Sequence, residues 1–164
     1  MDECNPLTTP MEQNLKLTST EGKEFEDATK YKQLVGSLNY LTTTRPDISF
    51  VVGILSRFMQ KPCEGHWSTA KRVLKYLKGT QDFGLKYTQV GDFSLIGYSD
   101  SYFDGDKENR VSTLGYNMSL RSGVVSSRSH KESVPTYSTT KAEYVAETEA
   151  TKEIEWVKKI LEYL

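Results

Sequence analysis

The sequence predicts an α+β protein in which a layer of three helices is followed by an antiparallel sheet and one long helix. Apolar residues recur at helical spacing up to about residue 80, and the spacing then changes to the alternation typical of strands. A helical pattern returns near residue 140. We therefore expect a flexible N-terminal segment over residues 1–26, a helical segment over 27–80 and a mixed segment over 81–164.

Three apolar stripes predict the helical layer. The first lies within residues 31–41, and the second follows Pro46, a residue that suits the first position of a helix, and stops at Pro62. The third covers residues 67–77 and ends at Gly79. Because the connections are short, the three helices should pack together.

Alternating patterns predict about four strands after the helices. Residues 83–88 and 93–99 suit a hairpin with a Gly-containing loop, and two more strands are expected at 112–120 and 123–128. A helix over about 140–163 closes the chain, and its apolar stripe should be buried. That stripe comprises Ala146, Ala150, Ile154, Val157, Ile160, Leu161 and Leu164.

The composition and the ends of the pattern limit the possible functions. The chain is 37% hydrophobic and 26% charged, and its net charge of −1 gives no overall attraction to nucleic acid or membranes. No signal peptide and no membrane-spanning run is expected, which favours a cytoplasmic or nuclear protein with no membrane partner. Cys4 and Cys63 suit two separate thiols, although one long-range disulfide remains possible.

The stretch GYSDSYFDGD carries three aspartates and raises the question of a metal site. Its spacing does not fit the calcium loop of an EF-hand. Asp104 and Asp106 suit a polar turn. Asp100 differs, because it lies where an apolar strand ends, close to a core, and such a carboxylate is more often a ligand or a hydrogen-bond acceptor.

The second candidate carboxylate is Glu143, in the stretch STTKAEYVAETEA. Thr140 and Glu143 also fit a helix capping box, so spacing alone leaves both roles open. Glu147 lies one turn further along the same face. Neither His66 nor His130 has a recognisable Ser or Cys partner, so the sequence does not support a hydrolytic triad.

A basic run, KRVLKYLKG, places four cations mostly opposite the apolar stripe of the third helix. They are Lys71, Arg72, Lys75 and Lys78. The usual interpretation of such a run is a solvated helix face, and the alternative is a face that contacts nucleic-acid phosphates.

Several stretches, in order, resemble the Pol polyprotein of copia-type LTR retrotransposons. They include YKQLVGSLNYLTTTRPDISFVVGILSRFM, HWSTAKRVLKYLKGT, GYSD, STLGY and STTKAEYVA. The resemblance implies a connection segment that follows a reverse transcriptase, and then the start of a ribonuclease H-like domain. It also implies that Asp100 and Glu143 are catalytic carboxylates that hold Mg²⁺, and that an RNA–DNA hybrid is the substrate.

The sequence departs from that family in two places. The family's Ser-Asp-Ala-Asp-Trp run here reads SDSYF, and the chain stops at Leu164, before the strand that bears the family's third catalytic aspartate. Two carboxylates hold Mg²⁺ weakly. We therefore expect a truncated ribonuclease H-like unit whose metal binding is weak or lost and whose catalytic site is incomplete.

Two non-enzymatic alternatives remain open at this point. The chain could be a nucleic-acid-binding module that uses its basic helix, with an RNA–DNA hybrid as the partner. It could instead be an interaction protein that uses uncovered apolar surface for a protein partner or for self-association. Similar copia-derived fragments carry the label of RxLR-type effectors, although this sequence has no Arg-x-Leu-Arg run near its start.

Overall fold

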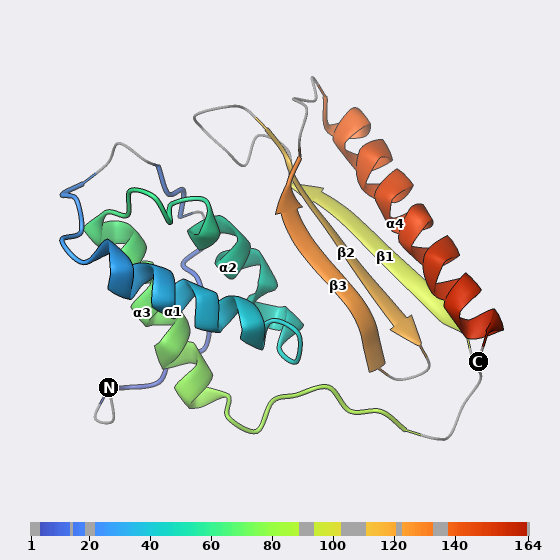
Figure 1. The fold of residues 1–164 in the computed structure, drawn as a ribbon, viewed down its shortest axis with the longest axis horizontal. Coiled ribbons are helices and arrows are strands. Elements are labelled where there is room, and N and C mark those ends of the chain that lie inside the picture. The colour runs from blue at the N-terminus through green and yellow to red at the C-terminus, as the bar shows by residue number, and fades with distance from the viewer. Residues whose placement is uncertain are drawn as a thin grey trace. The chain divides into compact units, whose positions relative to one another are not determined.

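The computed structural model describes residues 4–13, 15–18, 22–88, 94–102, 111–120, 123–132 and 138–163. Within these residues the architecture is α+β, with four α-helices and a three-stranded antiparallel sheet (Figure 1). The chain divides into two compact units, Met1–Gly84 and Leu85–Leu164. None of the described helices has the length and apolar character that a membrane span requires.

The first unit holds three of the α-helices. Its elements are α1 (Ala28–Leu41), the 3₁₀ turn η1 (Pro46–Ile48), α2 (Ser49–Ser56) and α3 (Glu64–Gly79). Asp27 caps α1 by accepting a hydrogen bond from the Lys30 backbone N–H at 2.9 Å, which satisfies one of the free donors of the first turn. Pro46 takes the first position of η1, as the sequence predicted.

One hydrophobic cluster lies between these three helices. Tyr31, Ile48 and Leu55 are among its largest fully buried side chains, and the Tyr31 hydroxyl donates a 2.8 Å hydrogen bond to the Leu55 carbonyl. Residues before α1 also pack on the cluster. Phe25, for example, stacks on Trp67 of α3 with ring centroids 4.7 Å apart. The sequence predicted a flexible segment over residues 1–26. Described residues of this segment lie against α3, where the Leu7 backbone N–H donates to the Lys75 carbonyl.

A buried arginine joins the connection after α1 to the end of α3. Arg45 is only 6% exposed and makes two hydrogen bonds to the Asp47 carboxylate, at 2.9 and 2.7 Å. It also donates to the Thr80 carbonyl and hydroxyl, at 2.9 and 2.7 Å. The Tyr76 hydroxyl completes the cluster with a 2.7 Å hydrogen bond to Asp47. Each of the three guanidinium nitrogens of Arg45 donates to at least one acceptor, as a buried guanidinium requires.

The second unit is a sheet with a helix on it. Its strands are β1 (Leu95–Tyr102), β2 (Thr113–Leu120) and β3 (Gly123–Lys131), in the order β1-β2-β3, and its helix is α4 (Thr139–Glu162). The pairing of β1 with β2 is regular, from Leu95 opposite Leu120 to Tyr102 opposite Thr113. The pairing of β2 with β3 is irregular between Met118 and Ser119. Helix α4 runs along β1 in the opposite direction (Figure 1).

The predicted strand at 83–88 is wrong. These residues have no regular structure, and the side chain rather than the backbone of Tyr87 makes the contact with β3. The Tyr87 hydroxyl donates to the Val124 carbonyl at 2.6 Å, and its ring lies where a side chain on Gly123 would be. The loop expected at 89–92 falls mainly on residues outside the described ones.

The predicted burial of the last helix holds only for its first half. Ala142, Ala146 and Ala150 are buried, whereas Ile160 and Leu161 are each 38% exposed. The sheet underneath ends before the helix does, because β1 and β2 are each eight residues long and α4 has 24. Leu164 lies outside the described residues.

Candidate functional site

The packing of α4 identifies which face of β1 lies under the helix. A Cβ atom built on Gly97 would lie 2.7 Å from Ile154 Cδ1 of α4 and 2.9 Å from the Met118 sulfur of β2. Gly97 therefore points toward the helix, and so do the residues two positions away from it along the strand. Gly97 and Met118 are opposite each other in the ladder, which agrees with this assignment.

Asp100 is an odd number of positions from Gly97 along β1, so its side chain projects from the face of the strand that α4 does not cover. Its side chain is exposed, and Oδ1 accepts a 2.8 Å hydrogen bond from the Ser101 backbone N–H. The prediction that Asp100 lies close to a core is therefore wrong. Since β1 is at the edge of the described sheet, this hydrogen bond satisfies an edge donor.

Glu143 does not cap its helix, so the capping role that its spacing left open is not observed. Helix α4 begins at Thr139, and the Ser138 side chain caps it by accepting from the Lys141 backbone N–H. Glu143 lies two residues beyond the position that a capping box uses and is exposed. Its helix packs on the face of β1 opposite to the one from which Asp100 projects.

No group of three or more His, Cys, Asp or Glu side chains in the described part of the chain is arranged to hold a metal ion. Asp104 and Asp106 lie outside the described residues. Two-metal catalysis needs carboxylates that converge on ions about 3.5–4 Å apart.

Polar contacts between β3 and α4 were not anticipated from the sequence. His130 Nε2 lies 3.0 Å from Glu149 Oε2, and the Ser126 hydroxyl donates to Glu153 Oε1 at 2.7 Å. The spacing of four residues between the two glutamates was the available signal, because it places them one above the other on a helix. These contacts fix α4 on the sheet. Nearby Tyr116 is partly buried, which raises the pKa of its hydroxyl.

His66 has a structural role. It is fully buried at the start of α3, where Nδ1 accepts a 2.9 Å hydrogen bond from the Cys63 backbone N–H. Its ring stacks on Phe58 with centroids 3.9 Å apart. Cys63 and Cys4 are both free thiols, so the possible disulfide is not formed.

The four basic residues of α3 fall into two pairs. Arg72 donates to Glu12 Oε1 at 3.1 Å and to the Thr9 hydroxyl at 3.0 Å, and Lys78 donates to the Cys4 carbonyl at 3.0 Å. The N-terminal segment therefore already holds these two cations. Neither the solvated face nor a free phosphate-binding face describes them.

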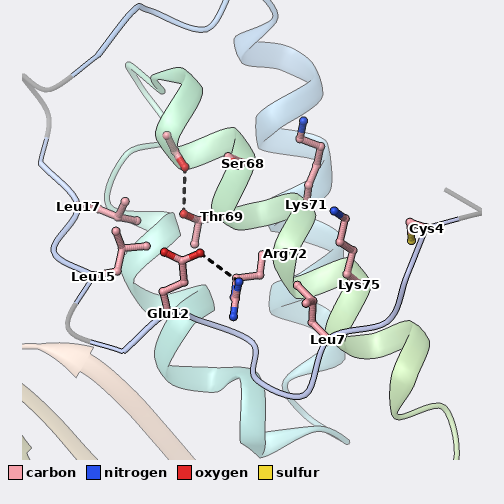
Figure 2. Close-up of a pocket in the computed structure, with 11 residues that line it drawn as sticks. Cys4, Leu7, Glu12, Leu15, Leu17, Ser68, Thr69, Lys71, Arg72 and Lys75 are labelled. Carbon is pink, nitrogen blue, oxygen red and sulfur yellow. Dashed lines mark hydrogen bonds and ion pairs between the residues drawn. The ribbon is translucent and has the colours of Figure 1, made fainter.

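Lys71 and Lys75 line a hollow of about 550 Å³ between the N-terminal segment and α3 (Figure 2). The Leu7 backbone N–H donates to the Lys75 carbonyl at 3.3 Å, which ties the segment to the helix beside this hollow. The segment before α1 carries Leu7, Glu12, Leu15 and Leu17 at irregular spacing, which gives no recognisable signal of such a site. The hollow was not predicted.

Comparison with known proteins identifies relatives along nearly the whole chain. The retrovirus-related Pol polyprotein from transposon RE2 of Arabidopsis thaliana is 40% identical over 158 residues, which are 96% of this chain and 11% of that polyprotein. The Pol polyprotein from transposon TNT 1-94 of Nicotiana tabacum is 39% identical over 171 residues and 13% of its length. The chain thus spans only a small part of these polyproteins.

A shorter relative is covered almost completely. Secreted RxLR effector protein 161 of Plasmopara viticola is 47% identical over 128 residues, which are 77% of this chain and 90% of that protein. No protein-family profile matches the chain, and no solved structure matches it. The long alignments to transposon polyproteins agree with the motifs along the sequence. The chain belongs to the copia-type retrotransposon Pol polyprotein family and corresponds to one segment of such a polyprotein.

Proposed function

We propose that the unit Leu85–Leu164 has the ancestry of a ribonuclease H domain, and that this chain by itself does not hydrolyse RNA–DNA hybrids. The order β1-β2-β3-α4 and the matches to Pol polyproteins support the ancestry. One observation carries the loss of hydrolysis. Asp100 lies on the face of β1 that α4 does not cover, and no group of three or more His, Cys, Asp or Glu side chains among the described residues could hold a metal ion.

The cost of an incomplete set of ligands is large. In a two-metal site each carboxylate must approach its ion within about 2.0–2.1 Å, the usual Mg²⁺–oxygen distance. Removing one group from a set that acts as a unit costs orders of magnitude in rate. A residual Mg²⁺ ion on Asp100 alone would be hydrated and weakly held, and it would supply neither the activated water nor the stabilised leaving oxygen.

The alternatives have less support from the geometry. A nucleic-acid-binding module would need an open basic face, and two of the four cations on α3 are held by the N-terminal segment. An effector role rests on the name of one relative.

The test is an assay of RNA cleavage in an RNA–DNA hybrid, with Mg²⁺ and then with Mn²⁺. We compare the unchanged chain with Asp100→Asn and Glu143→Gln, and use Glu147→Gln as the matched control, since Glu147 is an exposed glutamate one turn further along α4. We expect all four proteins to equal the blank without protein. Cleavage that both Asp100→Asn and Glu143→Gln abolish, and Glu147→Gln preserves, contradicts the proposal.

A further inference from the structure

The hollow beside α3 is built by two separate stretches of chain. Described residues between 4 and 17 form one wall, and the first three turns of α3 form the other (Figure 2). Its volume of about 550 Å³ falls within the range of about 300–1,000 Å³ typical of small-molecule sites. All of its lining lies within the unit Met1–Gly84. A nucleic-acid duplex is too wide to enter a space of this size, since its major groove alone is about 12 Å wide.

The charges around the hollow favour an anion. Lys71, Arg72 and Lys75 contribute three positive charges, and Glu12 contributes one negative charge, which leaves an excess of two positive charges (3 − 1) on the lining. Arg72 has one further buried donor, Nε, which has no hydrogen-bond partner within the described residues. A buried donor of this kind is costly until an acceptor reaches it.

The remaining lining is mostly apolar or small. Leu7, Leu15 and Leu17 come from the N-terminal segment, and Ser68 comes from α3 (Figure 2). Gly65 of α3 also lines the hollow. Leu17 also packs on the hydrophobic cluster of the unit, so this wall is fixed rather than free in solution. A bare inorganic ion would leave these leucines in contact with water, whereas an apolar body would cover them.

We propose that this hollow binds a small amphipathic anion, with its anionic head at Lys71 and Lys75 and its apolar body against Leu7, Leu15 and Leu17. The chemistry that recognises the head is shared by phosphate monoesters and carboxylates. The site is independent of Asp100 and Glu143, so the result of the cleavage assay has no bearing on it.

The probes are hexyl, octyl and decyl phosphate, each below its micelle concentration, with inorganic phosphate as the head alone. Isothermal titration calorimetry measures their dissociation constants. Each added CH₂ group should tighten binding by about fourfold, the fold-change that corresponds to about 0.8 kcal/mol per buried methylene. Decanoate forms the second arm. Binding within a few-fold of decyl phosphate assigns any anionic head, and much weaker binding assigns a phosphate head.

The decisive variant is Lys71→Gln/Lys75→Gln. It should weaken decyl phosphate binding by about tenfold or more, because charge-assisted hydrogen bonds to the head are lost. The matched control is Lys32→Gln/Lys61→Gln, which removes two exposed lysines of the same unit and should change the affinity less than about twofold. Amide chemical shifts on ligand addition should change at Ser68, Thr69 and Leu15. Thermal unfolding of each variant shows whether the unit remains folded.

Three results would each overturn the proposal. Inorganic phosphate that competes as well as decyl phosphate would show a simple ion site. Equal affinity of the Lys71→Gln/Lys75→Gln variant and its control would remove the lysines from recognition. Shift changes confined to the unit Leu85–Leu164 would place the ligand elsewhere.

Discussion

The two compact units bury their apolar side chains in different ways. In the unit Met1–Gly84, α1, α2 and α3 surround a continuous cluster that contains large side chains such as Tyr31 and Leu55. In the unit Leu85–Leu164, α4 covers one face of the sheet largely through alanines. On the other face of β1, Tyr98 is 64% exposed and Ile96 is 43% exposed.

This difference predicts unequal stability. The free energy of folding gained from burial grows with the apolar area removed from water, and an alanine contributes little area. The first unit should therefore unfold at a higher denaturant concentration than the second. Both candidate carboxylates, Asp100 and Glu143, belong to the second unit, and therefore to the part of the chain that we expect to be less stable.

The largest expected effect comes from the core of the first unit. Leu55→Ala removes a fully buried side chain and should lower the free energy of unfolding of that unit by about 2–5 kcal/mol. The chain has two tryptophans, Trp67 in α3 and Trp156 in α4, so one reports on each unit. Urea unfolding followed by fluorescence, in Trp156→Phe and Trp67→Phe backgrounds, measures the two transitions separately.

The control for this prediction is Tyr40→Ala. Tyr40 is 85% exposed on α1, and its removal should change stability by less than about 0.5 kcal/mol. If Leu55→Ala shifts the Trp156 transition as far as the Trp67 transition, the two units unfold together and the comparison between them fails.

The sequence predicted the positions of the helices better than the pairing of the strands. Helical spacing located α1, α3 and α4 within a few residues, because a helix needs only contacts that are local in the sequence. The alternation at 83–88 was misleading. The Arg45 guanidinium carbon instead lies 5.7 Å from the centroid of the Phe83 ring, and the Tyr87 hydroxyl donates a hydrogen bond to β3. Alternation cannot reveal that side chains rather than the backbone make the contact.

The candidate site was predicted as residues but not as geometry. Asp100 and Glu143 came from motifs, which say nothing of the face that α4 covers. That face depends on the close approach of Ile154 to Gly97, a contact 57 positions apart in the sequence (154 − 97). Ile96 and Tyr98 lie on the other face of β1, and the structure leaves both exposed. The hollow beside α3 was missed for the same reason, since it joins two distant stretches.

The second prediction tests the face assignment in the weaker unit. Gly97→Ala places a Cβ 2.7 Å from Ile154 Cδ1 and should destabilise that unit by about 1–3 kcal/mol through overpacking. Adding Ile154→Val removes the atom in conflict and should restore part of the loss. The Trp156 transition in urea is the measurement.

Gly115→Ala is the matched control for Gly97→Ala. Its Cβ would lie 3.7 Å from the nearest atom, the Arg128 carbonyl oxygen, which is an ordinary contact, so a small effect is expected. If Gly97→Ala is as mild as Gly115→Ala, α4 does not cover that face of β1. Asp100 could then face the helix, and the proposed loss of hydrolysis would lose its main support.

The smallest expected effect sharpens the comparison from the side of the first unit. The hydrogen bonds from Arg45 lower the pKa of Asp47 below the ordinary carboxyl value, and the Tyr76 hydroxyl acts in the same direction. A lowered folded-state pKa gives stability that is fully present above the unfolded pKa of about 3.9 and is lost as the pH falls through the folded value.

Asp47→Asn should therefore cost about 1 kcal/mol at pH 6, since the charge-assisted hydrogen bonds to Arg45 weaken. The difference between the unchanged chain and the variant should shrink as the pH falls below about 3.9, the unfolded value, and through the lowered folded pKa of Asp47, because the unchanged Asp47 is then progressively protonated. Urea midpoints from Trp67 fluorescence measure this difference at each pH, and the Trp156 transition should not respond to the substitution. A difference in stability that stays constant across this pH range would mean that the charge of Asp47 does not stabilise the first unit. The burial of large side chains in the first unit would then be the sole source of its greater stability relative to the second unit.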